Sequence, residues 1–266
     1  MRRYWISIRK GILIIGLPLL IAIILRLFCF DVYKIPSTSM TPTLIPGDFI
    51  LVSKMNYGSR ILNLRKFFKL GKTEYERVKG FSSIKRNDLV VFNWPDYASL
   101  KDSTQTMFGI VIVKRCYGIP GDTVMIKDDG VTLESASKQQ QKDELFPHDS
   151  TFQWTISNYG PLFVPGKGFS IKLTDRNVRI YKDVLAYEGI KFSIKGDSIF
   201  LNKRYVTNYT FKNNYYFMKG DNFYGSMDSR YWGFVPENNV IGKTIMVLFS
   251  NGEDGFQWKR LFHLIK

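Results

Sequence analysis

The amino-acid sequence predicts a mainly β protein that follows one apolar helix near the N-terminus. Three observations support this fold class. Residues 11–30 form an almost unbroken apolar run, aromatic residues make up 15% of the chain, and turn signals repeatedly precede short apolar runs. A length of 266 residues is enough for one membrane anchor and one large domain or two small ones.

The apolar run has the length of a membrane span. Residues 11–25 are apolar throughout, and residues 27–30 extend the run to about 20 positions if Arg26 is tolerated. Arg26 lies near the far end, where its long side chain can reach the lipid headgroups. A cleaved signal peptide is the alternative, but the residues after Arg26 supply no small-x-small cleavage site. We therefore predict a retained transmembrane anchor over residues 11–30.

Basic residues predict the orientation of this anchor. Within the first ten residues there are four of them and no acidic residue: Arg2, Arg3, Arg9 and Lys10. Positive charge before a first span favours a cytoplasmic N-terminus, and long domains translocate with little regard to their own charge. We predict a cytoplasmic basic tail over residues 1–10 and an external domain after residue 30.

Beyond the anchor, the chain has the pattern of an antiparallel sheet or barrel. A Gly-Asp or Asn-Asp pair precedes each of four short apolar runs, and we predict a strand at each: residues 49–52, 89–92, 123–126 and 198–201. The polar run 134–144 predicts a surface loop. Residues 61–72 mix apolar and basic side chains, which suits either a segment on the membrane surface or a solvated basic loop.

Charge and cysteine usage narrow the function classes. The formal net charge is +15, of which the first 30 residues carry +5 and the remainder +10. This charge favours anionic partners. With a membrane anchor and no nucleic-acid-binding motif, a phospholipid bilayer is the better candidate and nucleic acid is not expected. Cys29 and Cys116 predict free thiols, with Cys116 in the core. We expect no metal or cofactor, and we interpret His148 as a solvated loop residue, which argues against a serine–histidine triad.

Ser39 and Lys114 are the candidate catalytic pair. Ser39 follows the apolar run by nine residues, so its hydroxyl would lie close to the membrane surface. A serine hydroxyl is a weak nucleophile until a base removes its proton, and a lysine can be that base when burial lowers its pKa. The apolar residues 109–113 before Lys114 predict a strand that could bury the amine. The alternative is an ordinary strand-end lysine in solvent.

Four sequence blocks, taken in order, carry a resemblance to a known family. They are residues 36–48 (PSTSMTPTLIPGD), 86–92 (RNDLVVF), 114–122 (KRCYGIPGD) and 220–236 (GDN, then SMDSRYWGFVP). With the preceding anchor, they make the chain resemble bacterial type I signal peptidases, which are membrane-bound serine–lysine proteases. The resemblance covers the whole chain except residues 123–210.

The resemblance implies a role for each matching residue. Ser39 would be the nucleophile and Lys114 the general base, while the Ser37 hydroxyl and the Ser39 backbone N–H would donate to the oxyanion. Ser226 matches the serine that orients the lysine amine. Asp228 and Arg230 match a supporting ion pair.

The chain departs from the family pattern at residues 223–225. Here it has Phe-Tyr-Gly, whereas the family carries an Arg-Asp-Asn stretch. No proposed catalytic group is removed, so we interpret the departure as altered packing around the site.

The resemblance also implies pockets and a domain arrangement. Small side chains before the cleaved bond would enter pockets whose walls fall at Tyr33, Ile35, Leu44, Ile112 and Val113, for which plain core packing is the alternative. The implied fold is an antiparallel β catalytic domain over residues 31–122 and 214–266. A second β domain would be inserted over residues 123–213.

The expected function is therefore that of a membrane-bound serine endopeptidase. It would remove signal peptides from exported pre-proteins at the outer face of the cytoplasmic membrane. Its partners would be those pre-proteins, the phospholipid bilayer and the protein export machinery. The alternatives are a relative specialised for few substrates, or a catalytically idle anchored module that binds signal peptides or export partners.

Overall fold

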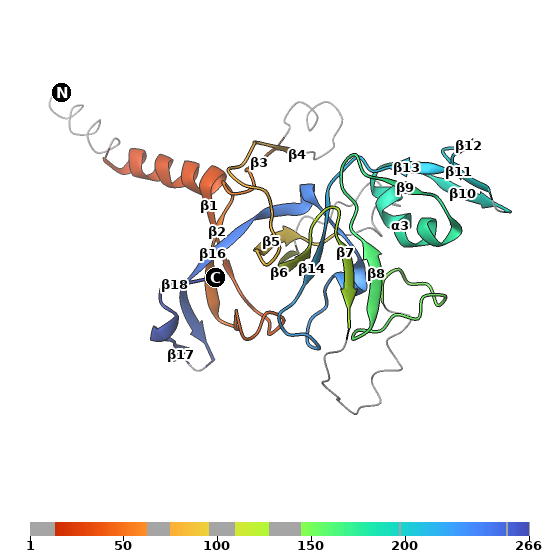
Figure 1. Ribbon diagram of the computed structural model, residues 1–266. Helices are drawn as coiled ribbons and strands as arrows, with labels where there is room; N and C mark the ends of the chain where they lie inside the picture. Colours follow the sequence, from red (N-terminus) through yellow and green to blue (C-terminus); the bar gives the residue numbers. More distant parts are fainter. Residues whose placement is uncertain are drawn as a thin grey trace, which may run out of the picture. The chain divides into compact units, whose positions relative to one another are not determined.

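The computed structural model describes residues 14–62, 75–95, 110–127, 145–196, 198–253 and 255–265 (Figure 1). The chain forms two compact units. The first unit contains Met1–Pro36, Pro46–Ser83 and Ile241–Lys266, and the second contains Ser37–Ile45 and Ile84–Val240.

The first described residues of the chain are helical. Residues 14–24 form an α-helix that continues as the π-helix η1 (Leu25–Cys29), and all side chains from 14 to 28 are exposed. In the part of the chain that the structure describes, no helix combines the length and the apolar character needed to cross a membrane. The predicted tail 1–10 and the first residues of the predicted anchor, 11–13, lie outside the described residues.

The first unit is built on antiparallel strands. In the order β1-β2-β16, strand β2 pairs with both neighbours, and β16 also pairs with two short C-terminal strands. The bounds are β1 Phe30–Lys34, β2 Asp48–Ser53, β16 Val240–Gly252, β17 Gly255–Phe256 and β18 His263–Leu264, with a separate hairpin of β3 Arg60–Leu62 and β4 Tyr75–Arg77. The short 3-10 helix η6 Trp258–Arg260 lies between β17 and β18, and η5 Glu237–Asn239, at the end of the second unit, precedes β16 in the sequence. Ile50 and Val52 alternate inward from β2, as a half-buried strand requires.

The central strands of the second unit are also antiparallel, in the order β5-β6-β14-β15. Their bounds are β5 Leu89–Asn93, β6 Val111–Gly118, β14 Tyr215–Lys219 and β15 Val235–Pro236, with the short helix α4 at Ser229–Trp232. Val90 lies opposite Lys114, and the β14–β6 register shifts between Phe217 and Met218. This register sets which β6 side chains share a face.

Further strands of the second unit surround one helix, α3 (Asp175–Tyr187). They are β7 Thr123–Ile126 with β8 Tyr159–Phe163, β9 Ser170–Lys172 with β13 Asn208–Thr210, and the sheet of β10 Phe192–Lys195, β11 Ser198–Leu201 and β12 Arg204–Tyr205. The Thr174 side chain caps α3 by accepting from the backbone N–H of Asn177 at 3.1 Å. Val178, Tyr181 and Val184 are buried on one side of the helix.

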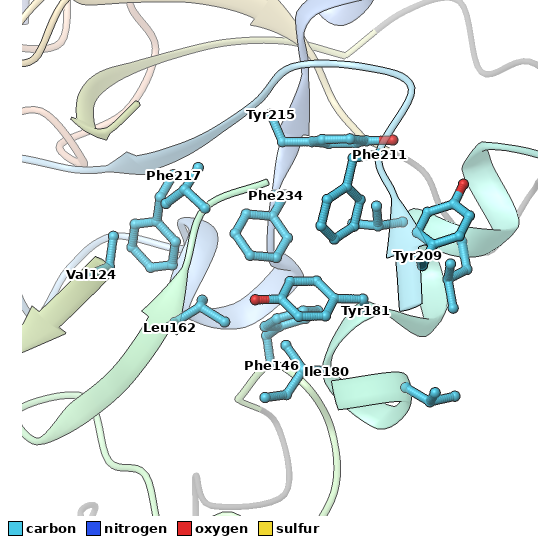
Figure 2. Close-up of a cluster of buried hydrophobic side chains, with 14 of the residues drawn as sticks. Val124, Phe146, Leu162, Ile180, Tyr181, Tyr209, Phe211, Tyr215, Phe217 and Phe234 are labelled. Atoms are coloured by element: carbon cyan, nitrogen blue, oxygen red, sulfur yellow. The ribbon is translucent and has the colours of Figure 1, made fainter. Parts of the chain in front are cut away.

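An aromatic core joins α3 to the central strands (Figure 2). Tyr181 stacks on Phe234 with ring centroids 5.9 Å apart, and Phe146 meets Phe234 edge-on at 5.6 Å. Phe217 of β14 belongs to the same cluster. The predicted inserted domain 123–213 thus shares a core with residues assigned to the catalytic domain, and its independence stays a prediction.

Several sequence expectations are confirmed at this level. All four predicted strands exist, within β2, β5, β7 and β11. Cys116 is a buried free cysteine, and His148 is exposed. Helix α3 was not anticipated within the predicted β insertion. The predicted loop 134–144 and most of the segment 61–72 lie outside the described residues.

Candidate active site

A short turn-rich segment of the second unit presents Ser39. The Thr41 N–H donates to the Thr38 carbonyl, and the Leu44 N–H donates to the Met40 carbonyl, each at 3.0 Å. Met40 and Leu44 are fully buried, whereas Ser39 between the turn and the core is half-buried. The two buried apolar side chains therefore fix a segment that leaves the Ser39 hydroxyl accessible.

Lys114 lies within β6, where its amine is buried and meets that hydroxyl. Its side chain is 3% exposed, and Nζ donates to Ser39 Oγ at 2.7 Å. Burial lowers the Lys114 pKa from 10.5 to about 8, against the opposing influence of the Asp228 and Asp221 charges. A buried, readily deprotonated amine at hydrogen-bonding distance from a hydroxyl has the geometry of a base and its nucleophile.

A second hydroxyl lies beside the first. Ser37 Oγ is 3.3 Å from Ser39 Oγ, and the Ser37 side chain is exposed. The structure thus brings together the three residues to which the sequence assigned reacting or oxyanion-binding groups: Ser37, Ser39 and Lys114.

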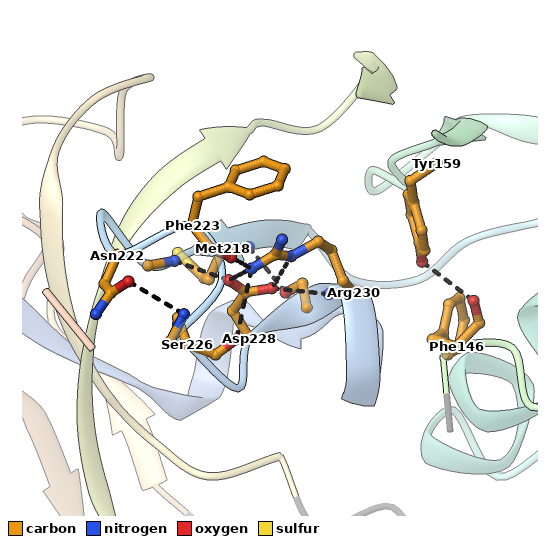
Figure 3. Close-up of polar contacts among 11 residues, drawn as sticks. Phe146, Tyr159, Met218, Asn222, Phe223, Ser226, Asp228 and Arg230 are labelled. Atoms are coloured by element: carbon orange, nitrogen blue, oxygen red, sulfur yellow. Dashed lines mark hydrogen bonds and ion pairs between the residues drawn. The ribbon is translucent and has the colours of Figure 1, made fainter. Parts of the chain in front are cut away.

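Asp228 and Arg230 form a fully buried ion pair (Figure 3). Arg230 Nε donates to Asp228 Oδ1, and Nη2 donates to Oδ2, both at 2.8 Å. Asp228 also caps α4 by accepting from the Arg230 N–H at 3.2 Å, and it accepts from the Gly220 N–H at 3.0 Å. The predicted pairing is present and bidentate. The Gly220 hydrogen bond to Asp228 connects the end of β14 to the start of α4.

Ser226 is close to the pair of reacting residues but does not make its predicted contact. Its hydroxyl is buried and has no hydrogen-bond partner among the described residues, and the Lys114 amine donates to Ser39. A Cβ placed on Gly220 would lie 2.0 Å from Ser226 Oγ and 2.6 Å from the Ser39 carbonyl oxygen. Ser226 therefore lies in the neighbourhood of Ser39, with Gly220 as the shared neighbour.

Asn222 holds the nucleophile segment, a role that our sequence reasoning missed. Its backbone N–H donates to the Ser39 carbonyl, and its side-chain Nδ2 donates to the Thr38 carbonyl, both at 3.2 Å. Its Oδ1 accepts from the Gly225 N–H at 3.1 Å. The residue belongs to a recognised sequence block, but nothing in the sequence indicated which atoms it would contact.

Arg115 makes a second ion pair that the sequence reasoning also missed. Its Nε and Nη2 donate to the Asp221 carboxylate at 2.7 and 2.6 Å, and its Nη1 donates to the Asn87 carbonyl at 2.8 Å. Nη2 lies 3.3 Å from Thr43 Oγ1. Arg115 directly follows Lys114 in β6, and its hydrogen bonds connect this strand to the segments that contain Asp221 and Asn87.

The predicted pocket residues are distributed between the units. Ile112 shares the Lys114 face of β6, whereas Val113 lies on the opposite face because strand side chains alternate. Leu44 is fully buried in the second unit. Tyr33 and Ile35 belong to the first unit: Ile35 is buried, and burial together with Asp31 raises the Tyr33 pKa to about 12. A shared pocket stays a prediction.

Comparison with known proteins covers the whole site. Residues 8–249 match the family model described as signal peptidase, peptidase S26. The chain is 32% identical over 259 residues to signal peptidase I of Buchnera aphidicola subsp. Acyrthosiphon pisum, covering 91% of this chain and 75% of that protein. It is 25% identical over 251 residues to signal peptidase I of Aquifex aeolicus, covering 91% and 84%. With signal peptidase I of Pseudomonas aeruginosa the identity is 28% over 246 residues, covering 87% and 69%.

Proposed function

Because the chain belongs to the signal peptidase family, peptidase S26, we propose that it removes signal peptides from precursor proteins with Ser39 as nucleophile and Lys114 as general base. The contact of 2.7 Å between the buried Lys114 amine and the Ser39 hydroxyl carries the proposal. Relatives named signal peptidase I align along about nine-tenths of this chain, which supports the proposal.

In the first half of the reaction, the neutral Lys114 amine accepts the Ser39 proton as Oγ attacks the carbonyl carbon of the bond to be cut. The resulting oxyanion accepts hydrogen bonds from the Ser37 hydroxyl and the Ser39 backbone N–H. The protonated amine then gives its proton to the departing amino group. The C–N bond breaks, and an ester joins the signal peptide to Ser39.

In the second half, water attacks the ester carbonyl while Lys114 accepts a proton from that water. The C–O bond to Ser39 breaks, and the proton on Lys114 returns to Ser39 Oγ. The products are a signal peptide with a free carboxylate and the regenerated hydroxyl. A lysine pKa near neutrality suits both roles, because the same amine must accept and donate a proton in each cycle.

Two carboxylates act on the protonation of the Lys114 amine. Asp228, paired with Arg230, and Asp221, paired with Arg115, each favour the protonated amine and so raise its pKa. Ser226 is the proposed orienting group for the amine, and its buried hydroxyl has no other hydrogen-bond partner among the described residues.

We place this chemistry at the outer face of a bacterial cytoplasmic membrane. The basic residues before the apolar run support a cytoplasmic N-terminus and an external catalytic unit. The proposed partners are signal-peptide-bearing precursors, the bilayer and the export machinery. Pocket walls at Leu44 and Ile112, both in the second unit, would select small side chains before the cut.

The test is cleavage of a generic signal-peptide substrate by the full-length protein in detergent. Ser39→Ala and Lys114→Met should each lower kcat/KM by about a thousandfold or more, because the hydroxyl and the amine act as a unit. Matched controls are Ser193→Ala and Lys195→Met on the exposed strand β10, which should leave turnover unchanged. Either catalytic variant retaining more than a few per cent of activity would overturn the assignment.

A catalytically idle module remains the alternative from a different class. A serine-directed acylating inhibitor separates the two, because only an activated Ser39 should become covalently labelled. Mass spectrometry of the digested protein locates the adduct. A specialised relative would instead label normally and cleave few precursors.

A further inference from the structure

The Phe223 ring lies against two cationic side chains of the site. The Arg230 guanidinium carbon is 4.7 Å from the ring centroid, and Lys219 Nζ is 4.8 Å from it. Lys219 Nζ is also 4.7 Å from the ring centroid of Tyr117. Figure 3 shows Phe223 beside the Asp228–Arg230 pair. Phe223 falls in the stretch where this chain departs from the family pattern, so its role is not carried over from the family.

Arg230 is a cation with an incomplete set of hydrogen bonds. Its side chain is fully buried, and Nη1 has no hydrogen-bond partner among the described residues. Its other nitrogens donate to Asp228, and Nη2 also reaches the Phe223 carbonyl at 2.6 Å and the Ser226 carbonyl at 3.4 Å. A buried N–H group that lacks an acceptor is unfavourable, and the negative face of an aromatic ring beside the guanidinium offsets part of that cost.

We propose that Phe223 is a positioning residue of the active site, whose ring face and carbonyl oxygen hold Arg230 in its pair with Asp228. Through that pair, Phe223 sets the negative charge that acts on the Lys114 amine. The inference rests on the proposed function, in which Lys114 is the base.

The electrostatic consequence has a definite sign. Asp228 and Asp221 both raise the Lys114 pKa against the effect of burial, and Arg230 and Arg115 neutralise these two carboxylates in turn. Lys219 is a further cation nearby, and its pKa is lowered by burial and by Arg230. If Arg230 loosens, Asp228 is less neutralised, the Lys114 pKa rises, and less neutral amine is present at a given pH.

The experiment compares side chains with and without an aromatic face. In Phe223→Leu, we expect the acid limb of kcat/KM to move up by about one pH unit and kcat/KM at pH 8 therefore to fall about fivefold. Phe223→Tyr and Phe223→Trp keep a π face and should stay within about twofold of the wild type. If Phe223→Leu does not fold, Phe223→Met provides a flexible replacement without a π face.

Tyr224→Leu is the matched control. The Tyr224 ring is exposed and contacts Phe223 edge-on. Replacing this aromatic ring by leucine should therefore leave the pH profile of kcat/KM unchanged. The inference is overturned if Phe223→Leu or Phe223→Met keeps the wild-type profile, or if the aromatic replacements are equally impaired. Ser39→Ala, measured in parallel, separates the proposed function from the role of Phe223. If Ser39→Ala still cleaves the substrate, the proposed function fails. If Ser39→Ala is inactive and Phe223→Leu behaves like the wild type, only the role of Phe223 is refuted.

Discussion

At the scale of single residues, Lys114 is the place where burial and charge act against each other. Burial lowers its pKa to about 8, while Asp228 and Asp221 oppose that effect. The carboxylates are themselves paired with arginines, which limits their influence on the amine. The balance leaves an amine that can change protonation state near neutral pH, as a base that works in both halves of a cycle requires.

The first prediction is a pH profile. Only the neutral amine can accept the Ser39 proton, so kcat/KM should rise with pH and reach a plateau above the Lys114 pKa of about 8. Initial rates between pH 6 and pH 10 on one substrate measure this, with protein stability checked at each pH. A rate that climbs steadily to pH 10 would indicate an unperturbed lysine or a different base.

The second prediction is a gain in stability when the amine is removed. The folded protein holds Lys114 at a lower pKa than the unfolded chain, so at pH values below about 8 folding buries a charge at a cost of up to about 3 kcal/mol. Lys114→Met fills similar space without that charge. It should be inactive yet more stable than the wild type at pH 7.

The pH dependence of that gain is the check on its cause. The wild type should gain stability as pH rises from about 8 to 10.5, because the unfolded state binds the extra proton over this range. The advantage of Lys114→Met should shrink over the same window. Denaturant unfolding at pH 7 and pH 10 measures both values, and an advantage that does not change with pH would point to packing instead of charge.

At the scale of elements, the end of β14 is where three parts of the site meet. Gly220 follows β14, donates to Asp228, and lies so close to Ser226 and the Ser39 carbonyl that a Cβ would overlap both. The close approach of backbone and side chains here requires glycine for reasons of space. The β14 end, α4 and the Ser39 segment therefore depend on one another for their spacing.

The third prediction tests this spacing. Gly220→Ala should lower kcat/KM at least about tenfold, because the new methyl must displace Ser226 or the Ser39 backbone. Gly168→Ala is the control: Gly168 has a positive φ of 85°, but apart from its two chain neighbours no heavy atom of the described structure lies within 4 Å of the added methyl. The control should lose some stability and keep its activity. Full activity in Gly220→Ala would show that the site tolerates a shift here.

At the scale of the whole molecule, charge and hydropathy divide the chain. The first 30 residues carry +5 with no acidic residue, and the remaining residues carry +10. In the helical segment formed by residues 14–24 and η1, residues 14–28 are mostly apolar and all exposed. These features are the support for the proposed anchored topology.

The fourth prediction follows from that topology. Protease added to intact spheroplasts should digest both compact units, because an N-terminal basic cluster favours a cytoplasmic N-terminus and an external remainder. A cytoplasmic marker protein should survive the same treatment, and detergent should expose it. Protection of both units in intact spheroplasts would reverse the proposed orientation.

Local signals explain why much of the fold could be predicted from the sequence. The four strands were predictable because Gly-Asp and Asn-Asp turns precede short apolar runs, and both features act over a few residues. Helix α3 was missed, although its Thr174 cap and the spacing of Val178, Tyr181 and Val184 are helical signals. We interpreted this region as part of a β insertion because its apolar stretch is short. In the structure, the apolar face of α3 packs against Phe234 through Tyr181.

For the site, the sequence by itself determined which residues carry reactive groups: a serine and a lysine in blocks typical of one family. Only the tertiary structure decided that Ser39 and Lys114, 75 residues apart, meet at 2.7 Å, and that the amine is buried enough to lower its pKa. It also decided that Arg115 pairs with Asp221 across 106 residues. The physical reason is that burial and long-range pairing arise when distant strands pack together, whereas turn, strand and motif signals are written in neighbouring residues.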